Sequence, residues 1–170
     1  NVTITSGALR ITNSNALGVA PTSGNKTVSL TNGTAGNPQL RLDGSGGNID
    51  LAAGIRYNTS NTAGVIFNEA GNNIVRGNIT CASGGGDTKI TVTAGTLTLE
   101  GNVAPNITGR TFVLGGTGTG ACNGIISNGT ATQTLAVSKA DAGTWTISGA
   151  NTYSGTTTVG AGTLLLGNAG

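Results

Sequence analysis

The chain contains no histidine, and this absence excludes whole classes of enzyme. Ser-His-Asp and Cys-His catalysis are ruled out, because both need an imidazole as general base. Charged residues make up only 8% of the sequence, and its acidic side chains form no cluster. Asp43 and Asp50 lie closest together, and Asp43, which precedes Gly44, fits a turn better than a catalytic pair. We therefore expect no enzymatic activity, no metal site and no cofactor.

Basic runs, long apolar runs and aromatic residues are also scarce. The eight basic residues are scattered from Arg10 to Lys139, so no patch indicates binding to nucleic acid. No apolar run approaches the roughly 18 residues of a membrane-spanning helix. Aromatic content is 3%, which is low for a large globular interior. A thin core of stacked Leu, Ile and Val suits this composition better.

Two cysteines are present, Cys81 and Cys122. An even number in a chain rich in Gly, Thr and Asn, with an extracellular character, allows one disulfide. The alternative is two unrelated, small, buried thiols. The sequence leaves both alternatives open.

Short segments with period-two alternation recur along the chain, and no segment shows the spacing of an amphipathic helix. In each of them the first and third residues are apolar, which predicts a strand with one buried face. Turn-forming Gly, Asn, Asp, Ser and Thr separate the segments. The segments are Val28-Ser-Leu30, Leu40-Arg-Leu42, Ile49-Asp-Leu51, Ile90-Thr-Val92, Leu97-Thr-Leu99, Phe112-Val-Leu114, Leu135-Ala-Val137, Trp145-Thr-Ile147 and Leu164-Leu-Leu166.

Strands this short fit either an antiparallel sandwich or barrel, or a parallel β-helix, also called a β-solenoid. The β-solenoid is favoured because the inward Leu, Ile and Val can stack on like residues one coil away. Regular Asn-Gly hairpin turns are also missing. At about 20 residues per coil, the chain would form about eight coils. We predict a single all-β domain over residues 1–170.

A nine-residue phrase occurs three times, at residues 3–11, 91–99 and 158–166. It reads Thr, an aliphatic β-branched residue, any residue, small, Gly, small, Leu, any residue, aliphatic. Two strands are thereby joined at a fixed step across a glycine, as a coil corner requires. Gly7, Gly95 and Gly162 are the predicted corner residues, where a side chain would clash or φ must be positive. The chain thus opens and closes on the same phrase.

The third copy lies in a longer resemblance over residues 143–167. This stretch contains Ser148-Gly-Ala-Asn-Thr-Tyr-Ser-Gly155, followed by Gly160-Ala-Gly-Thr-Leu-Leu-Leu166. It resembles the autotransporter-associated β-strand repeat, and segments 2–18 and 90–102 resemble the second half of that unit. The resemblance implies a right-handed parallel β-helix, secretion to the cell surface or medium of a bacterium, and a non-catalytic role as a stalk or scaffold.

The sequence-based hypothesis is a structural protein that stacks end to end into a filament or forms a surface stalk. Open sheet edges at the ends of a β-solenoid pair unless they are capped, and a head-to-tail contact of this kind does not close. The alternative is a passenger fragment of an adhesin that binds glycans or a host surface. The predicted stacking residues are Thr3, Ile4, Leu9 and Ile11 at one end, and Thr158, Val159, Leu164 and Leu166 at the other.

Thr-x-Thr pairs raise one more hypothesis, which is binding to ice. Such pairs occur at Thr3/Thr5, Thr91/Thr93, Thr117/Thr119 and Thr144/Thr146. An ice-binding surface needs a pair on every coil, and this spacing is irregular. Outward threonines with high β-propensity are the simpler interpretation.

Overall fold

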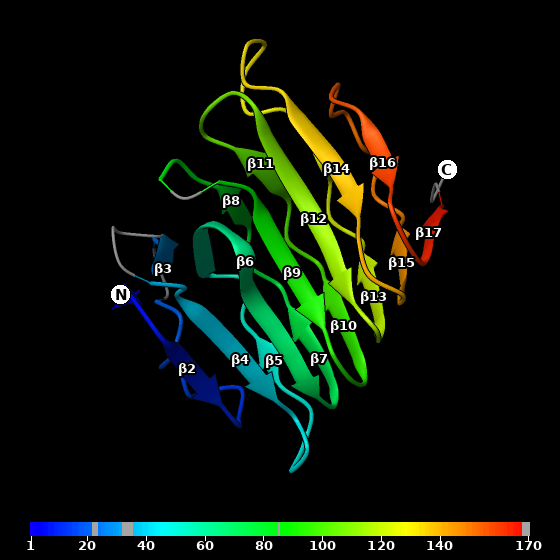
Figure 1. Ribbon diagram of the computed structural model, residues 1–170. Coiled ribbons are helices and arrows are strands. Elements are labelled where there is room, and N and C mark those ends of the chain that lie inside the picture. Colours follow the sequence, from blue (N-terminus) through cyan, green and yellow to red (C-terminus); the bar gives the residue numbers. More distant parts are fainter. Residues whose placement is uncertain (22–23, 32–35, 85, 168–170) are drawn as a thin grey trace.

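Parallel strands stacked coil upon coil form the whole structure, which is a computed structural model that describes residues 1–21, 24–31, 36–84 and 86–167 (Figure 1). The strands recur in a fixed order along the chain, and each pairs in parallel with a strand of the next coil. This arrangement is a β-solenoid, as the sequence predicted. In the described part of the chain, no helix has the length and apolar character needed to cross a membrane.

Each coil passes through three faces, which we call face 1, face 2 and face 3. Face 1 contains β1 (Val2–Thr3), β3 (Lys26–Thr31), the first half of β6 (Ile55–Ala70), β8 (Ile79–Cys81) and β11 (Val103–Pro105). Face 2 contains β2 (Ala8–Ile11), β4 (Gln39–Asp43), the second half of β6, β9 (Thr88–Val92), β12 (Arg110–Gly116), β14 (Leu135–Lys139) and β16 (Thr157–Val159). Face 3 contains β5 (Asp50–Leu51), β7 (Asn72–Val75), β10 (Thr96–Leu99), β13 (Thr119–Cys122), β15 (Thr144–Ile147) and β17 (Thr163–Leu166).

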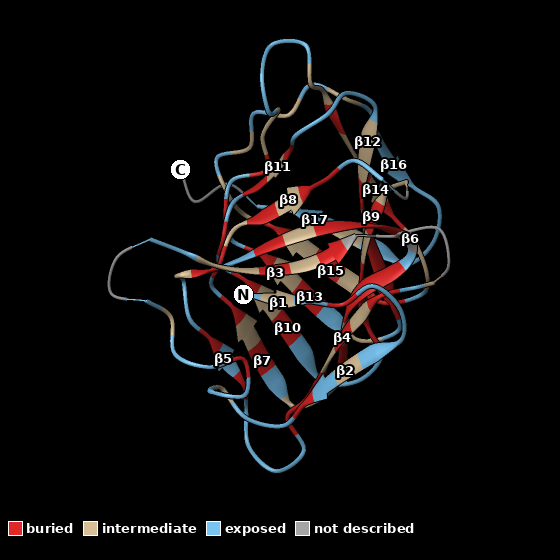
Figure 2. Cartoon of the chain, turned by 90° about the vertical axis from the view of Figure 1, so that its left-hand side faces the viewer, coloured by how far each residue is buried: buried red, intermediate tan, exposed pale blue. Residues whose placement is uncertain are grey.

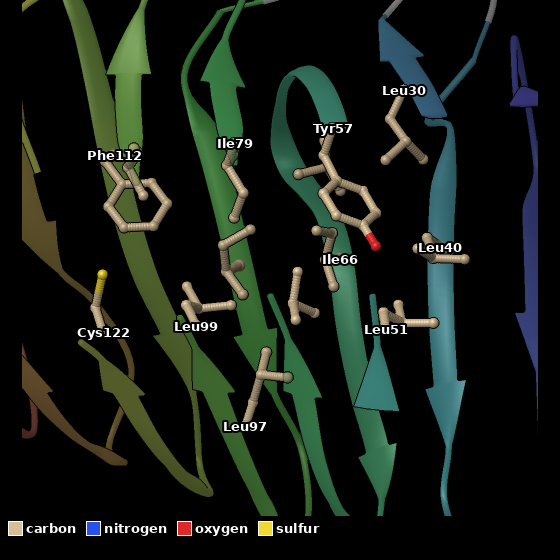
Figure 3. Close-up of a cluster of buried hydrophobic side chains, with 14 of the residues drawn as sticks. Leu30, Leu40, Leu51, Tyr57, Ile66, Ile79, Leu97, Leu99, Phe112 and Cys122 are labelled. Atoms are coloured by element: carbon tan, nitrogen blue, oxygen red, sulfur yellow. The ribbon is translucent and has the colours of Figure 1, made fainter. Parts of the chain in front are cut away.

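Alternating apolar residues build the core, as the period-two pattern predicted. The first and third residues of the first eight segments are all buried, and in Figure 2 the buried positions lie mainly on the strands and the exposed ones mainly in the loops. Figure 3 shows the aliphatic side chains in the interior, with Tyr57 and Phe112 between them. Only the last segment departs from the pattern, because Leu166 is 69% exposed.

The coils are longer than predicted, so they are fewer. Leu51, Val75, Leu99, Cys122 and Ile147 occupy the same inward position in successive coils, at steps of 24, 24, 23 and 25 residues. The six strands of face 3 therefore correspond to about six coils, where a step of about 20 residues had suggested eight. The extra residues are needed because every complete coil carries three strands and three corners.

The corners of the coil differ in length. The corner from face 3 to face 1 takes three residues in each of four coils, at 52–54, 76–78, 100–102 and 123–125. The corner from face 1 to face 2 varies, and its described examples include residues 82–84 with 86–87, 106–109 and 127–134. In Figure 1 the 127–134 loop projects beyond the strands at the top of the view.

Candidate functional site: the corners and ends of the solenoid

The three predicted corner glycines share one backbone conformation. Gly7, Gly95 and Gly162 have φ values of 73°, 70° and 69°, in the left-handed region that favours glycine. A Cβ at Gly95 would lie 2.2 Å from the carbonyl oxygen of Gly71, one coil away. At Gly162 the corresponding distance is 2.4 Å to Gly143, whereas the space beside Gly7 is empty. Two of the three corners therefore need glycine for contact as well as for φ.

The three copies of the phrase do not occupy the same corner. The second copy joins β9 to β10 and the third joins β16 to β17, so both turn from face 2 to face 3. The first copy joins β1 to β2 and turns from face 1 to face 2. The sequence suggested that the first and last copies form the same structural element. They do form the same local bend, but the first copy joins face 1 to face 2 and the last joins face 2 to face 3.

A second set of glycines was missed in the sequence. Gly77, Gly101, Gly124 and Gly149 lie above one another beside face 3, and a Cβ at each of the last three would lie 2.1–2.3 Å from the carbonyl oxygen of the glycine before it. Their spacing of 24, 23 and 25 residues is the coil period, so a search for glycine periodicity would have found them.

Asparagine side chains also tie successive coils together. The Asn78 Oδ1 atom accepts a hydrogen bond from the backbone N–H of Asn102, and the Asn102 Oδ1 atom accepts one from the N–H of Ile125. Each of these bonds joins a corner of one coil to the same corner of the next coil, outside the hydrogen bonds between paired strands. Hydrogen bonds therefore connect successive coils at these corners as well as within the sheets.

The end that carries β16 and β17 exposes apolar side chains. Val159 is 54% exposed and Leu166 is 69% exposed, while Leu164 is half-buried and Thr158 is exposed. Leu164 and Leu166 continue the inward rows of Trp145 and the residues before it. These side chains have the pattern of core residues, and no strand among the described residues pairs with β17 on its outer edge.

A cavity of about 740 Å³ opens at this same end. Ile147, Tyr153 and Leu166 line it, together with residues 149–152 and Gly167. The Tyr153 hydroxyl lies 2.8 Å from the Thr157 hydroxyl, so the aromatic ring is held at the rim.

The opposite end is more closed. Ile4 and Ile11 are buried, Leu9 is half-buried, and only Thr3 among the four predicted stacking residues is exposed. The two sets of predicted stacking residues therefore differ in their surroundings. Association through them stays a prediction.

A turn over residues 13–17 covers this end of face 3. The turn places Leu17 in the core at 3% exposure, and the Ser14 hydroxyl accepts a hydrogen bond from the N–H of Asp50 in β5. The first strand of face 3 is thus covered by a turn of its own chain. Among the inward residues at the two ends, the more exposed apolar side chains are those of the last coil.

The two cysteines are unpaired. Of the two alternatives that the sequence left open, a disulfide or two separate buried thiols, the structure has the separate thiols. Cys81 lies in β8 on face 1 and Cys122 in β13 on face 3, and both are buried free thiols. Burial raises the pKa of each thiol to about 12. Both therefore stay protonated and shielded at neutral pH.

The acidic residues pair with basic ones across coils. Asp43 and Glu69 contact Arg10, and Glu69 also contacts Arg41. Partial burial acts to raise the pKa of Glu69, but hydrogen bonds from Arg41 and Arg10 lower it overall. The pKa of Asp43 is lowered, first by hydrogen bonds from Ser45. Within the described residues, no three acidic or cysteine side chains gather where they could hold a metal ion.

Asp141 links its own coil to the two preceding coils at a corner. Its carboxylate accepts a hydrogen bond from the N–H of Gly116 at 2.8 Å and pairs with Lys89 at 2.9 Å. The Gly116 N–H and the Lys89 ammonium lower the pKa of Asp141. The residue has φ of 63°, which Asp tolerates better than most side chains.

Lys139 is fully buried beside this corner. Its Nζ atom donates hydrogen bonds to the carbonyl oxygens of Ala140, Asp141 and Ala161. Burial lowers the pKa of Lys139. The ammonium group thereby holds the last corner of the chain, which contains Ala161, against the preceding coil.

Stacked parallel coils, with glycine and asparagine ladders at their corners, define the fold as a β-solenoid. Residues 137–166, from β14 to β17, match the family model of the passenger-associated-transport repeat, which confirms the resemblance seen in the sequence. No curated protein and no solved structure matches the chain. The repeat and the fold together fit the passenger region of an autotransporter.

Proposed function

We propose that this chain is a non-catalytic structural section of an exported bacterial passenger protein, in which the stacked coils form a rigid stalk. The observation that carries the proposal is the continuous parallel pairing of face 3 from β5 to β17, with a passenger-associated-transport repeat in the last coils. Backbone hydrogen bonds run along the long axis of such a stack, and every coil contacts only its neighbours. A stack of this kind keeps its shape as it lengthens.

Localisation tests the proposal on cells that produce the protein. Antibodies raised against the purified chain should label intact cells or detect the protein in the medium, and protease added outside should remove the surface signal. Labelling that requires permeabilised cells, with the protein resistant to external protease, would contradict it.

The finer form of the proposal is end-to-end association through the open coil. The apolar rows that end at Leu164 and Leu166 support it, and face 2 presents a strand at both ends, β2 and β16. Replacing Leu166 by Lys puts a charge into the inward row at this end, and we expect it to prevent association. Leu165→Lys is the matched control, because Leu165 points outward from β17.

Electron microscopy and sedimentation at rising protein concentration distinguish the outcomes. End-to-end association predicts filaments that Leu166→Lys abolishes and Leu165→Lys preserves. Short rods of one length at every concentration would contradict association between ends and leave the stalk standing.

The second candidate is an adhesin passenger, which the 127–134 loop favours. This loop is the longest described corner from face 1 to face 2, and it exposes Thr130, Ala131 and Thr132. In repeat proteins, insertions often gather on the binding face. Binding to a glycan array or to host cells that disappears when the loop is shortened to four residues, as at 106–109, would support this function; binding that persists would place it elsewhere.

A further inference from the structure

Face 2 has a strand with an open edge at each end of the stack, β2 at one end and β16 at the other (Figure 1). Among the described residues, β16 (Thr157–Val159) pairs only with β14, and β2 (Ala8–Ile11) pairs only with β4. An open edge presents backbone N–H and C=O groups that can pair with another strand. Face 2 can therefore accept a further strand at both ends.

The free backbone groups of β16 belong to its inward residues. The N–H of Gly160 donates a hydrogen bond to β14 at 2.9 Å, and the C=O of Thr156 accepts one from β14 at 2.9 Å. Successive residues of a strand direct their backbone groups to opposite sides. Thr157 and Val159 therefore direct theirs to the open edge, while their side chains continue the inward rows of β14.

On β2 the alternation is the reverse. The C=O of Gly7 accepts a hydrogen bond from the first residue of β4 at 2.9 Å. By alternation, the inward residues Leu9 and Ile11 also direct their backbone groups to β4. Ala8 and Arg10, which point outward, direct theirs to the open edge. The free groups thus belong to inward residues on β16 and to outward residues on β2.

These two edges match when the strands run parallel and the copies lie head to tail. Thr157 then lies beside Leu9 and Val159 beside Ile11, so inward side chains stay next to inward ones. Each open N–H and C=O group on β16 meets an open group on β2, as at the coil boundaries within the chain. A two-fold contact between two β16 edges would instead place face 1 of one copy against face 3 of the other, so the coils would not continue.

The side chains at the two edges also fit this pairing. Val159 is 54% exposed and Leu9 is half-buried, although both lie in inward rows. Burying their apolar surface stabilises association. No charged residue lies on β16, and Arg10 on β2 is already paired with Asp43 and Glu69. The contact therefore leaves no charge without a partner.

We propose that copies of this chain join head to tail by parallel pairing of β16 with β2 of the next copy, with Thr157 beside Leu9. This inference rests on the end-to-end association proposed above, and it specifies the strands, the direction and the register of the joint. On face 3 the turn over residues 13–17 covers the first strand, through the bond from Asp50 to Ser14. β17 therefore contributes side chains to the joint and no strand pairing.

Disulfide trapping tests the register. Pairing of Thr157 with Leu9 puts the Cα atoms of Thr156 and Ala8 about 4.8 Å apart, which suits a disulfide. Thr156→Cys and Ala8→Cys, purified separately and mixed under mild oxidation, should give a linked dimer that neither variant gives alone. Thr158→Cys mixed with Ala8→Cys is the matched control, because this diagonal pair lies about 8 Å apart and is out of range.

A proline in β16 tests the backbone pairing. The Val159 N–H faces the open edge, so Val159→Pro keeps an apolar side chain and removes a donor that only the joint uses. In the Thr156→Cys background it should reduce the linked dimer to the background of the wild-type chain, whose Cys81 and Cys122 are buried. Val159→Ala keeps the donor and should reduce the dimer less. Thermal unfolding shows whether each variant is folded, and if Val159→Pro is not, the trapping experiment decides alone.

The outcomes separate this joint from the functions proposed above. Equal linking in the two mixtures, or linking in neither while filaments form, would overturn the joint and leave end-to-end association standing. Linked dimers of Thr158→Cys alone would also overturn it, in favour of two β16 edges that meet in antiparallel. Absence of both filaments and linked dimers at every concentration would overturn the joint together with end-to-end association, whereas the stalk is decided by localisation on cells.

Discussion

Gly95 turns the chain from face 2 to face 3 under two separate constraints, and each can be measured. Its φ of 70° is unfavourable for any residue with a Cβ, and a Cβ would also lie 2.2 Å from the carbonyl oxygen of Gly71. Two other glycines isolate these constraints. Gly109 has φ of 71° with open space around it, and Gly101 lacks positive φ but would place a Cβ 2.1 Å from the Gly77 oxygen.

The cost of each substitution by alanine follows from these contacts. Gly109→Ala should lower the free energy of unfolding by about 1 kcal/mol, since the left-handed conformation costs about 1–2 kcal/mol and the less flexible unfolded chain returns part of it. Gly101→Ala should cost about 1–3 kcal/mol, because a backbone carbonyl of the next coil must move. Gly95→Ala combines both effects and should cost about 2–4 kcal/mol.

Thermal and urea unfolding, followed by circular dichroism and by the fluorescence of the single tryptophan, measure these differences. For a chain of this size, Gly95→Ala should lower Tm by roughly 4–16 °C. Gly109→Ala should lower it least of the three. Equal losses in Gly95→Ala and Gly109→Ala would refute the argument that close contact between coils fixes glycine at this corner. A neutral Gly101→Ala would do the same for the second glycine ladder.

Three further predictions use other features of the interior and the corners. Because the pKa of Asp141 is lowered, its contribution to stability is present above about pH 4 and is lost as the pH falls through the lowered pKa; Asp141→Asn should therefore lower Tm at pH 7 and flatten its fall in acid. A Cβ at Gly120 would lie 2.4 Å from the indole of Trp145, so Gly120→Ala should displace the buried ring and shift its emission to the red, and an unchanged spectrum would contradict this packing. Cys81 and Cys122 should resist a thiol reagent in the native chain and both react in denaturant, whereas no reaction in denaturant without reductant would reveal a disulfide.

The sequence predicted the strands and the fold well, because period-two alternation depends only on local burial. Pairs such as Leu97 and Leu99 need a buried face whatever the number of coils, and both are buried. The long strand β6 was not predicted, because polar residues occupy the stretch where it crosses from face 1 to face 2. There Ser60 and Asn61 are buried, and Asn61 donates and accepts hydrogen bonds with its side chain.

The features that were not predicted depend on which residues pair between successive coils. A single sequence does not give this pairing unless the number of residues per coil is known. The nine-residue phrase encodes a bend at Gly7 as well as at Gly95, but it does not say which faces the bend joins. The surroundings of the two ends depend on a turn that no periodic pattern marks, the one that buries Leu17. That Thr96, Thr119 and Thr144 lie side by side on face 3 becomes visible only after strand pairing aligns them.

The contrast between the two kinds of corner has an evolutionary consequence. The corner from face 3 to face 1 has three residues in each of four coils, and the glycines stacked along it lie against each other's carbonyl groups. A single-residue insertion there would break the ladder in both neighbouring coils. The corner from face 1 to face 2 already varies in length, so a gene for this chain can gain or lose residues there while the rest of the solenoid keeps its register. That edge is the natural place to graft a foreign peptide onto the scaffold.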